Sequence, residues 1–69
     1  MLENNLKKIR TKHGMSQLEL SYDTRISPSD ISNIETGKQY PHKGWRKKIS
    51  KVLEVDEEEI FPEIDEKNN

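Results

Sequence analysis

The segment from Ser16 to Gly37 constrains the fold most, because it marks the start and the end of two consecutive helices. A Ser-x-x-Glu capping box opens the first helix at residues 16–19, with each side chain accepting from the other residue's amide. Ser27 is the N-cap of the second helix, and Pro28 takes its first position, where a missing N–H loses no hydrogen bond. Gly37 ends that helix in the left-handed conformation. The segment therefore predicts two short helices joined by a tight turn.

A helix, a turn and a second helix of this size form the unit that places one helix in the major groove of DNA. Ile31 and Ile34 share one face of the second helix and are expected in the core, while Ile26 closes the turn before it. The opposite face then presents polar residues to solvent. The segment therefore favours DNA binding.

Periodic apolar residues predict three further helices, and no strand, outside this segment, over about residues 4–13, 44–53 and 57–61. Gly14 ends the earliest of them and Asp56 caps the last. The chain continues into a polar, acidic tail, residues 63–69, which we expect to be disordered. The fold class is all-α, one compact five-helix domain over residues 1–62.

Charge is divided unevenly along the chain. Residues 1–51 hold 11 Lys and Arg against 5 Asp and Glu, a net charge of +6, whereas residues 52–69 hold 1 against 8, a net charge of −7. A basic body suits a polyanion, and the acidic end must then lie away from that partner. Charge alone leaves a solvated surface without a partner equally open, and the paired helices favour the polyanion.

The sequence resembles the Cro/phage-repressor-type helix-turn-helix domain of the XRE family. The resemblance runs from Leu6 to Phe61 and rests on capping, apolar and glycine positions at fixed spacing: Arg10, Gln17, Ile26, Ser27, Ile31, Ile34, Glu35 and Gly37. It implies a lambda-repressor-like domain whose helix-turn-helix covers about residues 17–36. It also implies a dimer on a palindromic operator, with the third helix as the reader of the DNA sequence.

Two positions depart from the family pattern. The family favours Ala where this chain has Ser21, and Gly where it has Arg25. Ser21 is small enough for close helix packing. Arg25 lies where the turn commonly needs a positive φ, which a residue with a side chain adopts only with strain. Either the turn differs slightly here, or some stability is lost locally.

Four residues on the outward side of the third helix are the candidate base readers: Pro28, Ser29, Ser32 and Asn33. Asn33 is the strongest candidate, because an amide donates and accepts at adenine. The serines discriminate weakly, and Pro28 offers only apolar contact, for example with a thymine methyl group. Asp30 either caps its own helix, which we favour, or accepts from a cytosine amine.

Phosphate contacts are expected from polar side chains around the helix ends: Ser16, Gln17, Arg25, Ser27, Lys38, Gln39 and Lys43. The Gln17 contact follows from the family resemblance and from the positive dipole end of the second helix. Arg10 and Glu35 are expected to form a structural ion pair between the first and third helices. A phosphate contact by Arg10 is the less favoured alternative.

The predicted fourth helix carries four cations, which either contact the DNA backbone or pair with the acidic run at residues 54–59: Arg46, Lys47, Lys48 and Lys51. Trp45 is expected in the core, with a dimer contact as the alternative.

The predicted function is sequence-specific regulation of transcription, by a homodimeric repressor or Cro-like switch protein on double-stranded DNA. The alternative is a protein-interaction module on the same fold, an antitoxin or an adaptor of another regulator, with residues 56–66 facing the protein partner. With no cysteine, two histidines and no glycine-rich phosphate loop, we expect no enzyme, cofactor, metal site or small-molecule ligand. No apolar run suits a membrane span, so we expect a cytoplasmic protein of a prokaryote or phage, on the nucleoid when bound.

Overall fold

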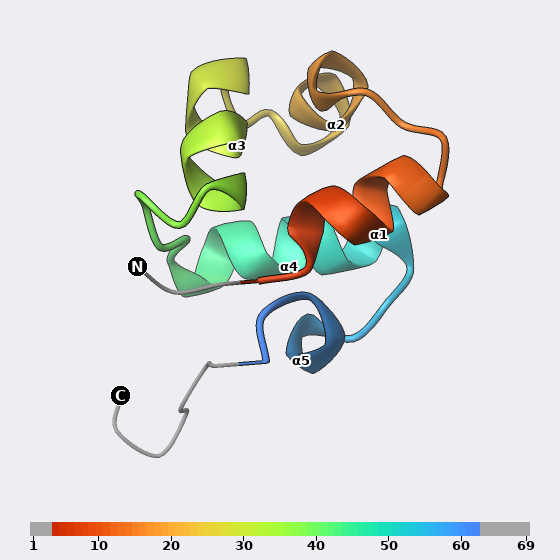
Figure 1. Cartoon of the computed structure of the whole chain (residues 1–69), viewed down its shortest axis with the longest axis vertical. Coiled ribbons are helices and arrows are strands. Elements are labelled where there is room, and N and C mark those ends of the chain that lie inside the picture. The colour runs from red at the N-terminus through yellow and green to blue at the C-terminus, as the bar shows by residue number, and fades with distance from the viewer. Residues whose placement is uncertain (1–3, 63–69) are drawn as a thin grey trace.

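The computed structural model of the chain describes residues 4–62, which form five helices and no strand. In chain order the helices are α1 (Leu6–Lys12), α2 (Gln17–Thr24), α3 (Pro28–Glu35), α4 (Lys43–Leu53) and α5 (Glu57–Ile60). Figure 1 shows α1 and α4 across the middle, α2 and α3 together on one side of them, and α5 on the other side. The predicted all-α fold is confirmed, and the predicted acidic tail lies outside the described residues.

The caps predicted for α2 and α3 are present. The Ser16 Oγ accepts from the Glu19 amide at 3.0 Å, and the Glu19 Oε1 accepts from the Ser16 amide at 2.8 Å. The Ser27 Oγ accepts from the Asp30 amide at 3.1 Å and donates to the Asp30 Oδ2 at 2.9 Å, so Asp30 takes part in the cap. Gly37 has a φ of 80° just beyond α3. Local sequence therefore determines where both helices begin and end.

The start of α1 is tied to distant parts of the chain. The Asn4 Oδ1 accepts from the Leu6 amide at 2.9 Å, while the Asn4 Nδ2 donates to the Ile34 carbonyl at 2.9 Å. The Asn5 amide donates to the Ile60 carbonyl at 2.8 Å. These bonds hold the start of α1 between α3 and α5. Because the bonded residues are far apart in sequence, no local pattern predicts this arrangement.

Helix ends outside the turn differ in detail from the sequence-based expectation, and α1 is shorter than expected at both ends. α4 begins at Lys43 rather than Gly44, because the ring Nδ1 of His42 accepts from the Trp45 amide at 3.3 Å and serves as the N-cap. Asp56 occupies the N-cap position of α5, but its side chain makes no capping hydrogen bond. α5 also ends one residue early, at Ile60.

The core draws on all five helices and the two segments that follow α2 and α5. Its members are at most 2% exposed: Leu6, Leu20, Ile26, Ile31, Ile34, Ile49, Leu53, Ile60 and Phe61. Trp45 and Val52 are half-buried and pack against this cluster, so Trp45, which was expected in the core, lies at its periphery. Ile9, expected to point inward, is also half-buried. The isoleucines of α3 are fully buried, which leaves the polar side of that helix facing outward.

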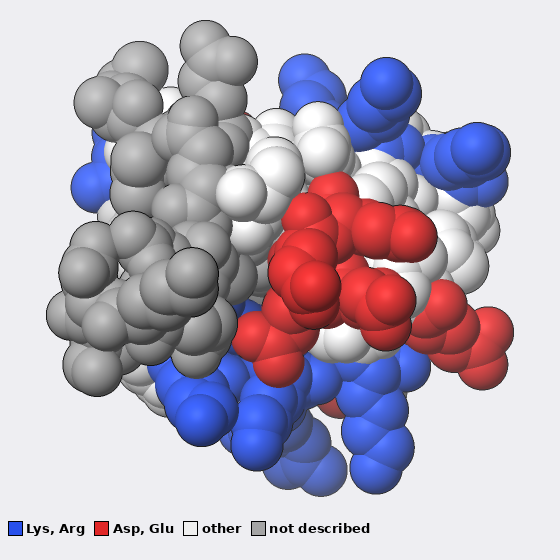
Figure 2. Space-filling model, turned by 90° about the horizontal axis from the view of Figure 1, so that it is seen from below, with Lys and Arg blue, Asp and Glu red and all other residues white. Residues whose placement is uncertain are grey.

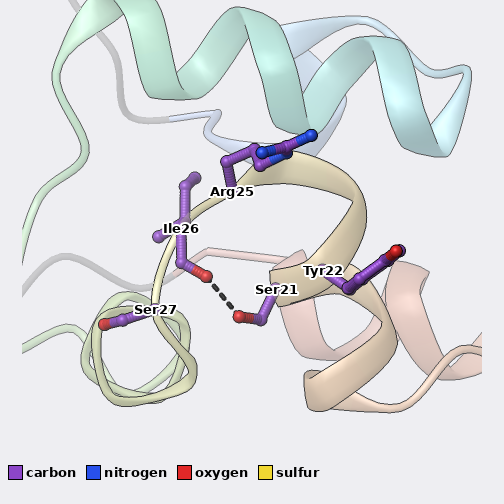
Figure 3. Close-up of a pocket in the computed structure, with 5 residues that line it drawn as sticks. All are labelled: Ser21, Tyr22, Arg25, Ile26 and Ser27. Carbon is purple, nitrogen blue, oxygen red and sulfur yellow. Dashed lines mark hydrogen bonds between the residues drawn. The ribbon is translucent and has the colours of Figure 1, made fainter.

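Both departures from the family pattern lie in one hydrogen-bonded turn. Arg25 has a φ of 63°, so the strained alternative considered for this position is the one the chain adopts. The Ser21 hydroxyl donates to the Ile26 carbonyl across the turn, as Figure 3 shows. An alanine at position 21 has no such donor, so Ser21 supports the turn that Arg25 strains. A second bond of this kind occurs after α4, where the Ser50 hydroxyl donates to the Val55 carbonyl across a turn at Glu54, which has a φ of 57°.

Replacing Arg25 with glycine should stabilise the domain. Glycine relieves a positive-φ strain of about 1–2 kcal/mol and loses about 0.5–1 kcal/mol through its greater freedom when unfolded. We therefore expect Arg25→Gly to raise the free energy of unfolding by about 0.5–1 kcal/mol in a urea titration. Arg25→Ala is the matched control, because it removes the guanidinium but keeps the Cβ. Equal stability of the two variants would contradict a strained turn.

Candidate nucleic-acid interface

The outward side of α3 carries all four candidate base readers. Pro28 and Ser29 are exposed in the first turn, whereas Ser32 and Asn33 are half-buried one turn later. The helix is held by its opposite side, where Ile31 and Ile34 are fully buried. α3 thus presents hydroxyl and carboxamide groups on a helix whose orientation is set by apolar packing.

The loop after α3 is anchored to the reader helix itself. The Asn33 carbonyl accepts from the Lys38 amide at 2.9 Å and from the Gln39 amide at 3.2 Å. The Thr36 hydroxyl also lies within hydrogen-bonding distance of that carbonyl, at 3.3 Å. Lys38 is exposed and Gln39 is half-buried. Two candidate phosphate ligands therefore keep a defined position relative to the strongest candidate base reader.

The beginning of α2 is also hydrogen-bonded to α3, through Glu35, the last residue of α3. The Gln17 Nε2 donates to the Glu35 Oε1 at 2.9 Å, and Gln17 is half-buried. The sequence offered Gln17 as a phosphate ligand and gave no sign of this bond. Ser16, the N-cap just before it, is exposed.

Glu35 also forms an ion pair with Arg10. The Arg10 Nε donates to the Glu35 Oε2 at 2.5 Å and the Nη2 donates to Oε1 at 3.2 Å, with side-chain exposures of 8% and 2%. The Arg10 Nη1 reaches the Met15 carbonyl at 2.7 Å. One buried carboxylate therefore connects α1, α2 and α3 at the point where α2 begins.

The remaining candidate phosphate ligands are exposed but do not form one cluster. Arg25 lies in the turn, Ser27 at the start of α3 and Lys43 at the start of α4. Figure 3 shows the Arg25 side chain projecting away from Ser27. These groups can therefore contact a long backbone at separate places, and they do not form a pocket for one small anion.

Acidic side chains gather on the far side of the domain from α2 and α3. Figure 2 shows them over the α5 side, with lysine and arginine side chains around them. The exposed members are Glu54, Asp56, Glu58 and Glu59. α5 lies across α1 and α4 from the two helices of the candidate interface (Figure 1), so these four acidic residues lie away from it, as charge complementarity with a polyanion favours, whereas Glu19 and Asp23 are exposed on α2 itself.

Arg46 is not a solvated cation of α4. It is 5% exposed, its Nε lies 3.4 Å from the Glu57 Oε1, and its Nη1 donates to the Pro41 carbonyl at 3.0 Å. For this residue, pairing with the acidic run is the alternative that the structure adopts. The three lysines of the same helix are exposed: Lys47, Lys48 and Lys51.

Within residues 4–62 no group of histidine or carboxylate side chains is arranged to hold a metal ion. None of the described helices has the length and apolar character needed to cross a membrane.

Comparison with known proteins identifies the family. Residues 4–66 match the family described as the helix-turn-helix domain, which covers most of the chain. No curated protein matches the chain significantly.

Proposed function

The chain belongs to the helix-turn-helix domain family, and we propose that it is a sequence-specific transcriptional regulator, a repressor that binds double-stranded DNA. In this proposal α3 lies in the major groove and contacts base edges with its outward side.

One observation carries the proposal most strongly. Two of the segments that carry candidate phosphate ligands are hydrogen-bonded to α3, the start of α2 through Glu35 and the loop at residues 38–39 through the Asn33 carbonyl. Phosphate contacts set the position of a reader helix on the duplex, and base contacts then specify the sequence. Phosphate contacts from these two segments therefore support a defined register of α3 in the groove.

In this arrangement each candidate base reader and phosphate ligand has a chemical role. Asn33 donates to and accepts from an adenine, the hydroxyls of Ser29 and Ser32 contact neighbouring base edges, and Pro28 packs on a thymine methyl group. The backbone is held by side chains on either side of α3: Ser16, Gln17, Arg25, Ser27, Lys38, Gln39 and Lys43. No arginine is among the candidate base readers, so we expect an operator whose strongest contact is an adenine.

We further propose that the protein acts as a homodimer on a palindromic operator. One domain reads a half-site of only a few base pairs, whereas two reader helices about 34 Å apart contact one face of the duplex at successive turns. The doubled interface then supplies the affinity that one short helix lacks.

Selection from random duplex DNA tests this function. We expect a palindromic consensus, and Asn33→Ala should relax one base position per half-site with a loss of about 1–3 kcal/mol in binding free energy. Thr11→Ala, at an exposed position of α1, is the matched polar control and should change neither affinity nor preference. Failure of the wild-type protein to enrich any sequence would exclude the proposed function. An unchanged consensus with Asn33→Ala would instead exclude Asn33 as a reader.

One observation favours a second function, a protein-interaction module. Leu18 and Tyr22 are 67% and 83% exposed, and they lie one turn apart on α2. Exposed apolar side chains of this size are common at protein interfaces. An antitoxin or adaptor would bind one partner through these side chains and could bind another on the acidic α5 side, which lies across α1 and α4 from α2. These two side chains lie outside the set of proposed DNA ligands, so substitutions there separate the two functions.

A further inference from the structure

Glu35 receives more donors than charge neutralisation requires. Arg10 already contacts both carboxylate oxygens, and Gln17 adds a further donor to Oε1. The Glu35 side chain is 2% exposed and ends α3, whereas Gln17 is half-buried and begins α2. A buried group of the reader helix thus reaches a side chain at the surface of its neighbour.

The chemistry of this bond selects one orientation of the carboxamide. An ionised carboxylate only accepts hydrogen bonds, so it can hold the Gln17 NH₂ group but not its carbonyl oxygen. The amide nitrogen has two N–H bonds, and one of them suffices for Glu35. The other N–H then belongs to a side chain that is already ordered before DNA arrives.

We propose that Glu35 is a positioning residue for DNA binding: its buried carboxylate orients the Gln17 carboxamide so that the second N–H meets one backbone phosphate. The inference rests on the proposed DNA-binding function and names the group that prepares one of its contacts. Pre-ordering matters because a side chain that is ordered only on binding loses rotamer freedom at that step. Arg10 acts indirectly, since it holds the carboxylate in place.

Two double variants separate positioning from structural support. Arg10→Met with Glu35→Leu removes the ion pair and the acceptor, whereas Arg10→Met with Glu35→Gln removes the ion pair but keeps an amide oxygen for Gln17. Replacing both partners of a buried pair avoids the unpaired charge that makes single substitutions so damaging. The two variants therefore differ mainly in whether Gln17 has an acceptor.

The readout is affinity for the selected operator, in which each phosphate in turn is replaced by an uncharged methylphosphonate. In the wild-type protein we expect about a tenfold loss at one phosphate, which Gln17→Ala removes. That loss should fall below about twofold with the leucine variant and persist with the glutamine variant, while the losses at other phosphates stay unchanged.

Two results would overturn the inference: an unchanged loss at the Gln17 phosphate in the leucine variant, or equal changes at all phosphates in both variants. Absence of DNA binding by the wild-type protein would instead reject the function itself. If either double variant does not fold, NMR of the free wild-type protein decides. The chain has two glutamines, and the Gln17 side-chain NH₂ should exchange with water at least tenfold more slowly than that of Gln39. Equal exchange rates would reject the positioning role.

Discussion

Glu35→Ala should lower the free energy of unfolding by about 3–5 kcal/mol, the largest loss expected from truncating any one buried polar side chain of the domain. The substitution leaves the Arg10 guanidinium buried without its counter-charge, at the junction of α1, α2 and α3. A chain of 69 residues has about 3–10 kcal/mol of total stability, so the variant should lose about a third or more of it. Urea titration followed by the fluorescence of Trp45, the single tryptophan, measures the change.

The second ion pair provides the control for this prediction. Glu57→Ala removes the carboxylate next to Arg46, but the Glu57 side chain is 26% exposed and lies 3.4 Å from the guanidinium, whereas Glu35 is 2% exposed and lies 2.5 Å from Arg10. We expect a loss of only about 1 kcal/mol there, in the range measured for partly exposed pairs. If Glu35→Ala were no more destabilising than Glu57→Ala, the buried carboxylate would not be the junction that its contacts indicate.

Affinity for the operator should fall about a thousandfold when salt is raised from 50 to 200 mM. Three of the proposed phosphate ligands in each subunit are cations, Arg25, Lys38 and Lys43, which makes six in a dimer. Release of the counter-ions from as many phosphates gives a slope of about −5 in a plot of log K against log salt concentration. Titrations at four or more salt concentrations measure the slope directly.

Single charges can be assigned with the same plot. Lys38→Gln should make the slope shallower by about 2 for a dimer, because one phosphate contact is lost in each subunit. Lys51→Gln is the matched control on α4, outside the proposed set, and should leave the slope nearly unchanged. A flat plot for the wild-type protein would count against any binding mode based on the DNA backbone.

The helix boundaries around the turn were predictable because their causes are local. The capping box at residues 16–19, the Ser27 cap and the left-handed Gly37 each involve residues at most four positions apart. Even the strained φ of Arg25 was anticipated as one of two alternatives. The aliphatic residues of α3 were equally accessible to sequence reasoning, since helical periodicity shows which of them share a face.

Other features of the site could not be predicted because their causes are distant in sequence. Arg46 looks like one of four equivalent cations on α4, yet it is buried against Pro41 and Glu57. The burial of Arg46 depends on where the acidic segment and the α3–α4 loop pack. The cap of α4 by the His42 ring is a local bond, to the amide three residues further on, and it was missed because histidine is not among the preferred N-cap residues.

The sequence by itself determined that two short helices flank a tight turn and that one of them shows a polar side to solvent. Hydrogen bonds within a few residues and the helical period suffice for that outcome. Only the tertiary structure decided that the start of α2 and the loop after α3 are both fastened to the reader helix. The bond from Gln17 to Glu35 joins the start of α2 to the end of α3, 18 residues further along the chain. Whether these two side chains meet depends on how the whole core packs.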